Sequence, residues 1–147
     1  MARPKNRREP QTGADAQAPR WHLGQYIRLS REDVAKGKCG DESNSVANQK
    51  RMLDEYHRMH LAQFADVKVY VDDGATGTDM SRAGFQRLLA DVMERKINCV
   101  IVKDLSRLSR NYSDAGRLIE HLFVQLNVRF ISLNEAIDSY LDPACFP

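Results

Sequence analysis

The chain has 147 residues, of which 42% are hydrophobic, and this length favours a single domain with one modest core. Its formal net charge of +2 is too small to indicate nucleic-acid binding unless the charge is gathered locally. The apolar runs are too short to span a bilayer, and the basic start lacks the apolar stretch of a signal peptide, so we expect a cytoplasmic protein.

The beginning of the chain is basic and shows no hydrophobic periodicity. Its first 20 residues hold five Arg or Lys residues against two acids, and residues 1–22 are predicted to be a disordered basic tail. The tail can be read as a solvated leader or as a weak DNA-binding arm. A folded domain is predicted over residues 23–140, followed by an irregular end at 141–147.

The first half of that domain alternates strand and helix patterns. A short strand is expected at 22–29, then a polar loop at 31–44. Ser45 is placed to cap a helix through about residue 63, with an apolar face of Val46, Leu53, Tyr56 and His60. A strand at 67–71, a glycine-containing loop at 72–82 and a second helix follow. The second helix carries its apolar residues at helical spacing: Phe85, Leu88, Leu89, Val92 and Met93.

The second half continues the alternation. A third strand is expected at 99–103, and its β-branched run at 100–102 predicts a central strand covered on both faces. Ser113 is placed to cap a third helix, with an apolar stripe of Leu118, Ile119, Leu122, Phe123 and Leu126, and a fourth strand is expected at 128–133. The pattern fades after residue 134. The order predicts an α/β fold: a mostly parallel central sheet of about four strands with helices on both faces.

The three cysteines, Cys39, Cys99 and Cys145, are scattered and form no C-x-x-C pair. This spacing gives no support to a disulfide framework or a zinc site. Cys99 falls within the central apolar strand, where a thiol is typically an inert part of the core.

Polar residues follow the first and third predicted strands, where they are not suited to a hydrophobic core. Arg28 and Ser30 end the first strand, while Lys103, Arg107 and Arg110 follow the third. In a parallel sheet these ends open on one edge, which is where α/β sheets bind ligands. Arg82, in the loop after the second strand, can join them. A serine facing several cations indicates an anion site, with a phosphodiester as the obvious ligand. The alternative is ordinary surface charge with Ser30 as a strand-end serine.

Competing chemistries find less support in the sequence. The four histidines lie outside the strand-end loops, so a Ser-His-Asp triad is not indicated. Carboxylates for a metal-dependent reaction are present but outnumbered locally by arginines, and no metal-binding or Walker motif occurs. The arginines can instead hold a phosphate's non-bridging oxygens and stabilise the charge of a pentacovalent transition state.

Four motifs in order resemble the serine recombinases, the resolvase/invertase family. They are Y-x-R-x-S ending at Ser30, S-x-x-x-Q ending at Gln49, D-x-x-[ST]-G from Asp73 with R-x-G from Arg82, and K-x-L-x-R-L-x-R from Lys103. The resemblance covers about residues 23–134. The segments around these motifs are most similar to the large serine recombinases of transposon-type mobile elements.

The resemblance implies a mechanism and a set of site residues. Ser30 attacks a DNA phosphodiester and joins the 5′ phosphate, and four subunits cut, exchange and rejoin two duplexes. DNA and further copies of the chain, as dimer and tetramer, are the implied partners. Neither ATP nor a metal cofactor is required, because the phosphoserine link conserves the bond energy. The implied phosphate-binding residues are Arg28, Arg82, Arg107 and Arg110, with Tyr26, Gln49, Asp73, Thr76 and Lys103 in support.

The chain departs from the family pattern in three places. Ser106 stands where small resolvases often carry an acid, and the loop at 31–44 is longer than theirs. The family continues into a long helix with another catalytic arginine and then a DNA-binding region. We therefore expect a truncated copy with little activity alone. The alternatives are a non-catalytic interaction fragment that binds a full-length recombinase or DNA weakly, and a domain for small phosphorylated ligands.

Overall fold

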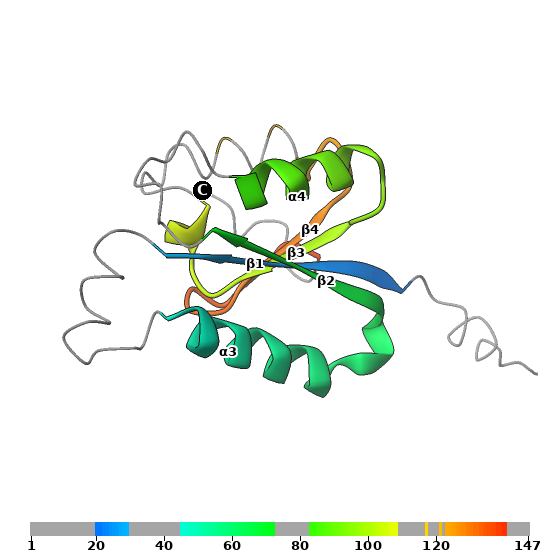
Figure 1. The fold of residues 1–147 in the computed structure, drawn as a ribbon. Helices are drawn as coiled ribbons and strands as arrows, with labels where there is room; N and C mark the ends of the chain where they lie inside the picture. The colour runs from blue at the N-terminus through cyan, green and yellow to red at the C-terminus, as the bar shows by residue number, and fades with distance from the viewer. Residues whose placement is uncertain are drawn as a thin grey trace, which may run out of the picture.

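A mixed five-stranded sheet forms the centre of the described structure (Figure 1). The computed structural model describes residues 20–29, 45–72, 83–108, 117, 121 and 123–140, and every structural statement refers to these residues. The spatial order is β2-β1-β3-β4-β5. The strands are β1 (Trp21–Arg28), β2 (Phe64–Asp72), β3 (Cys99–Val102), β4 (Arg129–Ser132) and β5 (Ile137–Asp138).

The register brings the carboxyl ends of the inner strands to one edge of the sheet. β1 pairs in parallel with β2 and with β3, and β3 pairs in parallel with β4. Arg28 lies opposite Asp72, and Gln25 lies opposite Ile101, so β1 and β3 point the same way side by side. Segments that follow β1 and β3 therefore leave the sheet next to each other.

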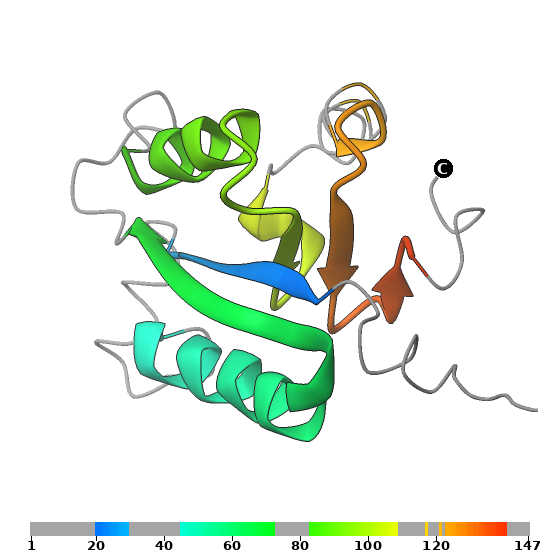
Figure 2. The same ribbon diagram turned by 90° about the vertical axis from the view of Figure 1, so that its right-hand side faces the viewer.

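Two helices cover opposite faces of this sheet. Figures 1 and 2 show α3 (Val46–Met59) on one side and α4 (Ala83–Met93) on the other. Ser45 caps α3, because its hydroxyl accepts a hydrogen bond from the Asn48 amide at 3.0 Å. Two single-turn 3₁₀ helices complete the described elements: η2 (Leu61–Gln63) after α3 and η4 (Leu105–Arg107) after β3.

Alternation along β1 divides the core into two layers. Leu23 and Ile27 pack with Leu53 of α3, whereas Tyr26 packs with Leu88 of α4. Gly24 permits the second contact, because a Cβ there would lie 3.0 Å from the Leu88 Cδ1 atom. The four residues of β3 are buried, as the continuous apolar run predicts. Burial raises the pKa of the Cys99 thiol, in keeping with an inert core residue.

The predicted fold class is confirmed, with differences in detail. The helix expected to reach about residue 63 ends at Met59, and η2 covers Leu61–Gln63. The sheet has a fifth strand, β5, which runs antiparallel to β4 and was not predicted. β2 is longer than predicted and begins at Phe64. The predicted tail reaches too far, because Trp21 and His22 already belong to β1. Residues 1–19, the loop at 31–44, the end at 141–147 and most of the helix after Ser113 lie outside the described residues. Within the described ranges, no helix is long and apolar enough to cross a membrane.

Candidate active site

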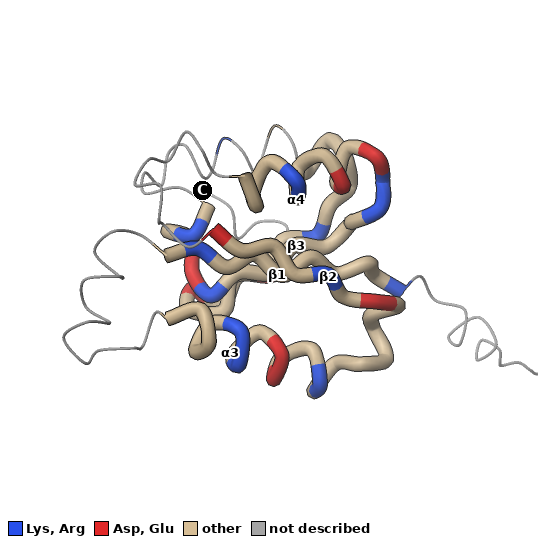
Figure 3. Tube along the Cα trace, in the orientation of Figure 1, with Lys and Arg blue, Asp and Glu red and all other residues tan. Residues whose placement is uncertain are grey.

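The carboxyl edge of the sheet gathers buried charge. Figure 3 shows basic and acidic positions close together where β1, β2 and β3 end. Arg28, the last residue of β1, and Arg107, in η4, are each only 5% exposed. Arginines are seldom this buried unless their donors are matched by acceptors.

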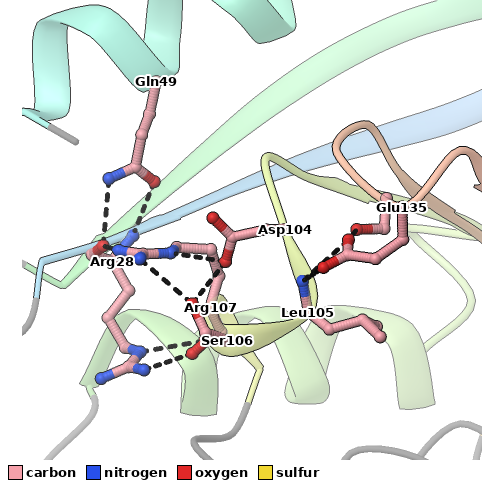
Figure 4. Close-up of polar contacts among 8 residues, drawn as sticks. Arg28, Gln49, Asp104, Leu105, Ser106, Arg107 and Glu135 are labelled. Atoms are coloured by element: carbon pink, nitrogen blue, oxygen red, sulfur yellow. Dashed lines mark hydrogen bonds and ion pairs between the residues drawn. The ribbon is translucent and has the colours of Figure 1, made fainter. Parts of the chain in front are cut away.

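The two arginines hold each other's backbone. The Arg28 guanidinium donates from Nε to the carbonyl of Arg107 at 3.0 Å and from Nη2 to the carbonyl of Ser106. Arg107 donates in turn from Nη1 to the carbonyl of Arg28 (Figure 4). These reciprocal bonds join residues 79 positions apart and fix the end of β1 against the turn that follows β3.

Gln49 secures the same strand end from the other face of the sheet. It is fully buried on α3, and its Nε2 donates to the Arg28 carbonyl at 3.1 Å. The Arg28 amide donates back to the Gln49 Oε1 at 3.4 Å. The carboxamide thereby serves both backbone groups of a residue at the end of a strand, where the sheet no longer supplies partners. Figure 4 shows the side chain reaching down from α3 to Arg28.

A carboxylate two residues before Ser106 completes the environment of Arg107. The Asp104 Oδ1 accepts from the Arg107 Nε at 3.2 Å and from the Ser106 hydroxyl. The Arg107 Nη2 donates to the Ser106 Oγ at 3.1 Å. The Asp104 and Arg107 side chains are 16% and 7% exposed, so this ion pair is largely removed from solvent. Asp104 thus supplies a negative charge beside Arg107, whereas Ser106, the residue next to Arg107, is neutral.

Residues that follow β4 hold the turn after β3 in place through hydrogen bonds. The Glu135 carboxylate accepts from the Leu105 amide, with the shorter distance 3.2 Å, and from the Ser132 hydroxyl. The Asn134 amide donates to the backbone carbonyl of Lys103 at 2.8 Å. Lys103 itself is buried. The path from β3 into η4 is therefore fixed by the segment that follows the neighbouring strand.

Tyr26 belongs to a second polar junction at the same edge. Its side chain is fully buried, and its hydroxyl donates to the Asp72 Oδ2 at 2.7 Å. Asp72 ends β2, directly beside the end of β1. The predicted strand tyrosine is therefore placed by a carboxylate that was not assigned to the site.

The structure brings Arg28, Gln49 and Arg107 into direct contact, with Lys103 on the neighbouring strand end. Five predicted site residues lie outside the described residues: Ser30, Asp73, Thr76, Arg82 and Arg110. The roles of all the predicted site residues, described or not, remain predictions. Within the described ranges, no group of three or more His, Cys, Asp or Glu side chains is arranged to hold a metal ion.

Sequence reasoning missed three carboxylates that organise this edge: Asp72, Asp104 and Glu135. Asp104 stood inside the motif, and its spacing from Arg107 was a usable signal, since residues three apart face each other in a helical turn. Glu135 lies where the pattern faded, and its contact with Leu105 spans 30 residues, so no local signal pointed to it.

The chain resembles known proteins over most of its length. Residues 24–144 match the family described as Resolvase, N terminal domain. The N-terminal catalytic domain of TP901-1 integrase is 31% identical, with a TM-score of 0.63 over 81% of this chain and 82% of that one. A resolvase family site-specific recombinase from Streptococcus pneumoniae is 25% identical, with a TM-score of 0.68 over 84% of this chain and 78% of that one. The strand-end arginine site and these matches together place this chain in the resolvase family of serine recombinases, as its N-terminal catalytic domain.

Proposed function

We propose that this chain carries out the strand-cleavage chemistry of site-specific DNA recombination, with Ser30 as the nucleophile. The observation that carries the proposal is the buried pair of arginines at the carboxyl edge of the sheet, because Arg28 lies two residues before Ser30. The serine oxygen forms a bond to phosphorus, the bond from phosphorus to the 3′ oxygen breaks, and the proton passes to the released 3′ hydroxyl. The protein keeps the 5′ phosphate.

The arginines supply the electrostatic part of this reaction. Fixed guanidinium groups stabilise the extra negative charge of the pentacovalent transition state without the reorganisation that water would need. We assign this role to Arg28 and Arg107, joined by Arg82 and Arg110. Lys103 adds positive charge at the same edge.

We propose that phosphate binding by Arg107 involves an exchange of partners. Its three guanidinium nitrogens donate to Asp104, to the Arg28 carbonyl and to the Ser106 hydroxyl. Two of these acceptors are neutral, and a phosphate oxygen is a stronger acceptor because it carries charge. We propose that the DNA phosphate takes the place of a neutral acceptor while the bond to Asp104 remains.

DNA is the proposed partner, and further copies of the chain are the proposed assembly partners, as membership of the resolvase family implies. The association with transposon-type elements and a cytoplasmic location are likewise proposals. We propose no cofactor, since the phosphoserine link itself stores the energy for rejoining.

Covalent capture of DNA tests the proposal. Duplexes labelled at their 3′ ends and tiling the DNA that flanks the gene are incubated with the chain and separated under denaturing conditions. We expect a labelled protein–DNA adduct that Ser30→Ala abolishes. Ser45→Ala is the matched control, since it removes the α3 cap hydroxyl and leaves the strand-end serine intact. An adduct that persists in Ser30→Ala, or none from the wild-type chain, contradicts the proposal.

A further inference from the structure

One carboxylate joins three elements beside the proposed active site. Asp72, the last residue of β2, accepts from the Tyr26 hydroxyl of β1 at 2.7 Å. It also accepts from the first turn of α4, from the Gly84 amide at 2.7 Å and the Phe85 amide at 3.0 Å. The first amides of a helix have no partner within the helix, and a carboxylate there also offsets the helix dipole. Asp72 thus anchors the start of α4 to the sheet edge.

The sequence makes room for this anchor at one position. A Cβ on Gly84 would lie 2.7 Å from the Val71 carbonyl oxygen and 3.1 Å from the Asp72 Cγ. Both neighbours lie on the end of β2, and the nearer one is backbone, so a side chain at this position would push α4 away. Glycine allows the helix amides to reach the carboxylate. The approach of α4 to β2 and the hydrogen bonds of Asp72 therefore depend on each other.

The anchor closes the ends of one particular segment. Residues 73–82 connect Asp72 to α4, so the bonds from Asp72 to Gly84 and Phe85 tie the two ends of that segment together. Arg82 is the residue immediately before α4 and is a proposed phosphate ligand. On the sheet side, the same carboxylate holds Tyr26.

We infer that Asp72 is a positioning residue of the active site, and this inference rests on the proposed function. Its carboxylate sets where α4 begins relative to β1, the strand that ends in Arg28. Asp72 itself does not contact the reacting atoms. Tyr26 takes part as the β1 end of the same connection, which gives the strand tyrosine a structural reason for its place two residues before Arg28.

A matched control exists between the same two elements. Tyr70 of β2 donates its hydroxyl to the Asp91 Oδ2 of α4 at 2.6 Å, and Lys68 binds the same oxygen at 2.8 Å. This is again a tyrosine–carboxylate bond that connects the sheet to α4, but it lies near the end of the helix rather than its start. Asp91→Ala therefore removes a similar contact without disturbing the first turn of α4.

Amide hydrogen exchange of the free protein tests the anchor without DNA. In Asp72→Ala we expect exchange at the Gly84 and Phe85 amides to accelerate about tenfold or more, because the acceptor that protects them is gone. Asp72→Asn should give a smaller acceleration, since its remaining oxygen can still accept. Asp91→Ala should leave both amides close to wild type. Unchanged exchange in Asp72→Ala would overturn the inference.

The rate of adduct formation then tests positioning. Asp72→Ala should slow adduct formation about tenfold while changing the Kd for the same duplex less than about twofold, since it misplaces a ligand of the transition state. Asp91→Ala should keep the wild-type rate. Equal slowing in both variants would show a general loss of stability and overturn the positioning role. A wild-type chain that forms no adduct counts against the proposed function, while the exchange experiment still decides the anchor.

Discussion

Arg107 combines a structural role with the chemical role proposed for it. It is buried, and its donors are matched by a carboxylate, a carbonyl and a hydroxyl within a single turn of chain and the adjacent strand end. These hydrogen bonds offset part of the cost of burying the charge, and they hold the guanidinium in a fixed orientation. The bond to Asp104 matters most, because the Asp104 carboxylate is charged, whereas the Arg28 carbonyl and the Ser106 hydroxyl are neutral acceptors.

The first prediction concerns this pair. Asp104→Asn should lower the free energy of unfolding by about 2 kcal/mol, the usual scale for a hydrogen bond to a charged group. Adding Ser106→Asp should recover at least half of the loss, since it returns a carboxylate to the neighbourhood of the Arg107 guanidinium. Urea denaturation of the single and double variants measures both effects.

Asp66→Asn is the control for that series, because the Asp66 carboxylate is 65% exposed and bonds only to His22 among the contacts described. Its unfolding free energy should stay within about 0.5 kcal/mol of wild type. If Asp104→Asn behaves like this control, the carboxylate at 104 does not hold Arg107.

At the scale of single residues, the sequence predicted that Arg28 and the residues after β3 lie close together. It did not predict which atoms accept their hydrogen bonds. Parallel strands that end in Arg28 and Lys103 must open on one edge, and Arg28 does meet Arg107 there. Which acceptors the guanidinium groups use depends on the backbone path after each strand. The carbonyls of Arg28 and Ser106 are acceptors that every residue possesses, so no residue type marks them.

At the scale of elements, β5 is the strand that pattern reading missed. It has two residues, too few to show any alternation, and it pairs only with β4. A side-chain contact fixes it instead. Arg129 of β4 is 3% exposed and binds both carboxylate oxygens of Asp138 on β5, at 2.9 and 2.6 Å. β5 thus places the Asp138 carboxylate beside the buried Arg129 guanidinium. A contact of this kind produces no local pattern in the sequence.

The second prediction follows from that dependence. Asp138→Ala should lower the free energy of unfolding by about 3 kcal/mol, because it leaves the Arg129 guanidinium buried without a countercharge. Gln63 Oε1, 2.8 Å from Arg129 Nη1, remains as a neutral acceptor and sets a limit to the loss. Asp138→Asn, which retains one acceptor oxygen, should lose less. Thermal and urea unfolding measure the series, and a change below about 0.5 kcal/mol in Asp138→Ala would contradict the assigned role.

At the scale of the whole molecule, the proposed active site and the Arg129 contacts lie at opposite ends of the sheet. The arginine site lies at the carboxyl ends of β1 and β3, whereas Arg129 opens β4, with its guanidinium carbon 5.5 and 5.2 Å from the ring centroids of Trp21 and Tyr140. Figure 1 shows α3 and α4 lying along opposite faces of the sheet between these ends. This division explains why the element order predicted the architecture well, while the polar contacts at each end required the structure.

The third prediction concerns acid stability and rests on Asp91. Hydrogen bonds from Lys68 and then from Tyr70 hold the pKa of the Asp91 carboxyl below its ordinary value of 3.8. When the pKa of a carboxyl is lower in the folded than in the unfolded state, the carboxyl stabilises the fold. This contribution is complete when the pH is above the pKa of the unfolded state. That contribution is lost as the pH falls through the folded value. We therefore expect the urea midpoint to fall on acidification from about pH 6 to about pH 3.

Asp91→Asn separates this group from the other carboxyls. The variant should have a lower urea midpoint than wild type at neutral pH, because Lys68 and Tyr70 lose a charged acceptor. Its midpoint should also fall less steeply in acid, since one proton-linked group has been removed. The two curves should converge toward the lowest pH, where the wild-type carboxyl is itself protonated. Parallel curves at all pH values would show that the pKa of Asp91 is the same in the folded and unfolded states. The bonds that join α4 to β2 would then make no contribution to the loss of stability in acid.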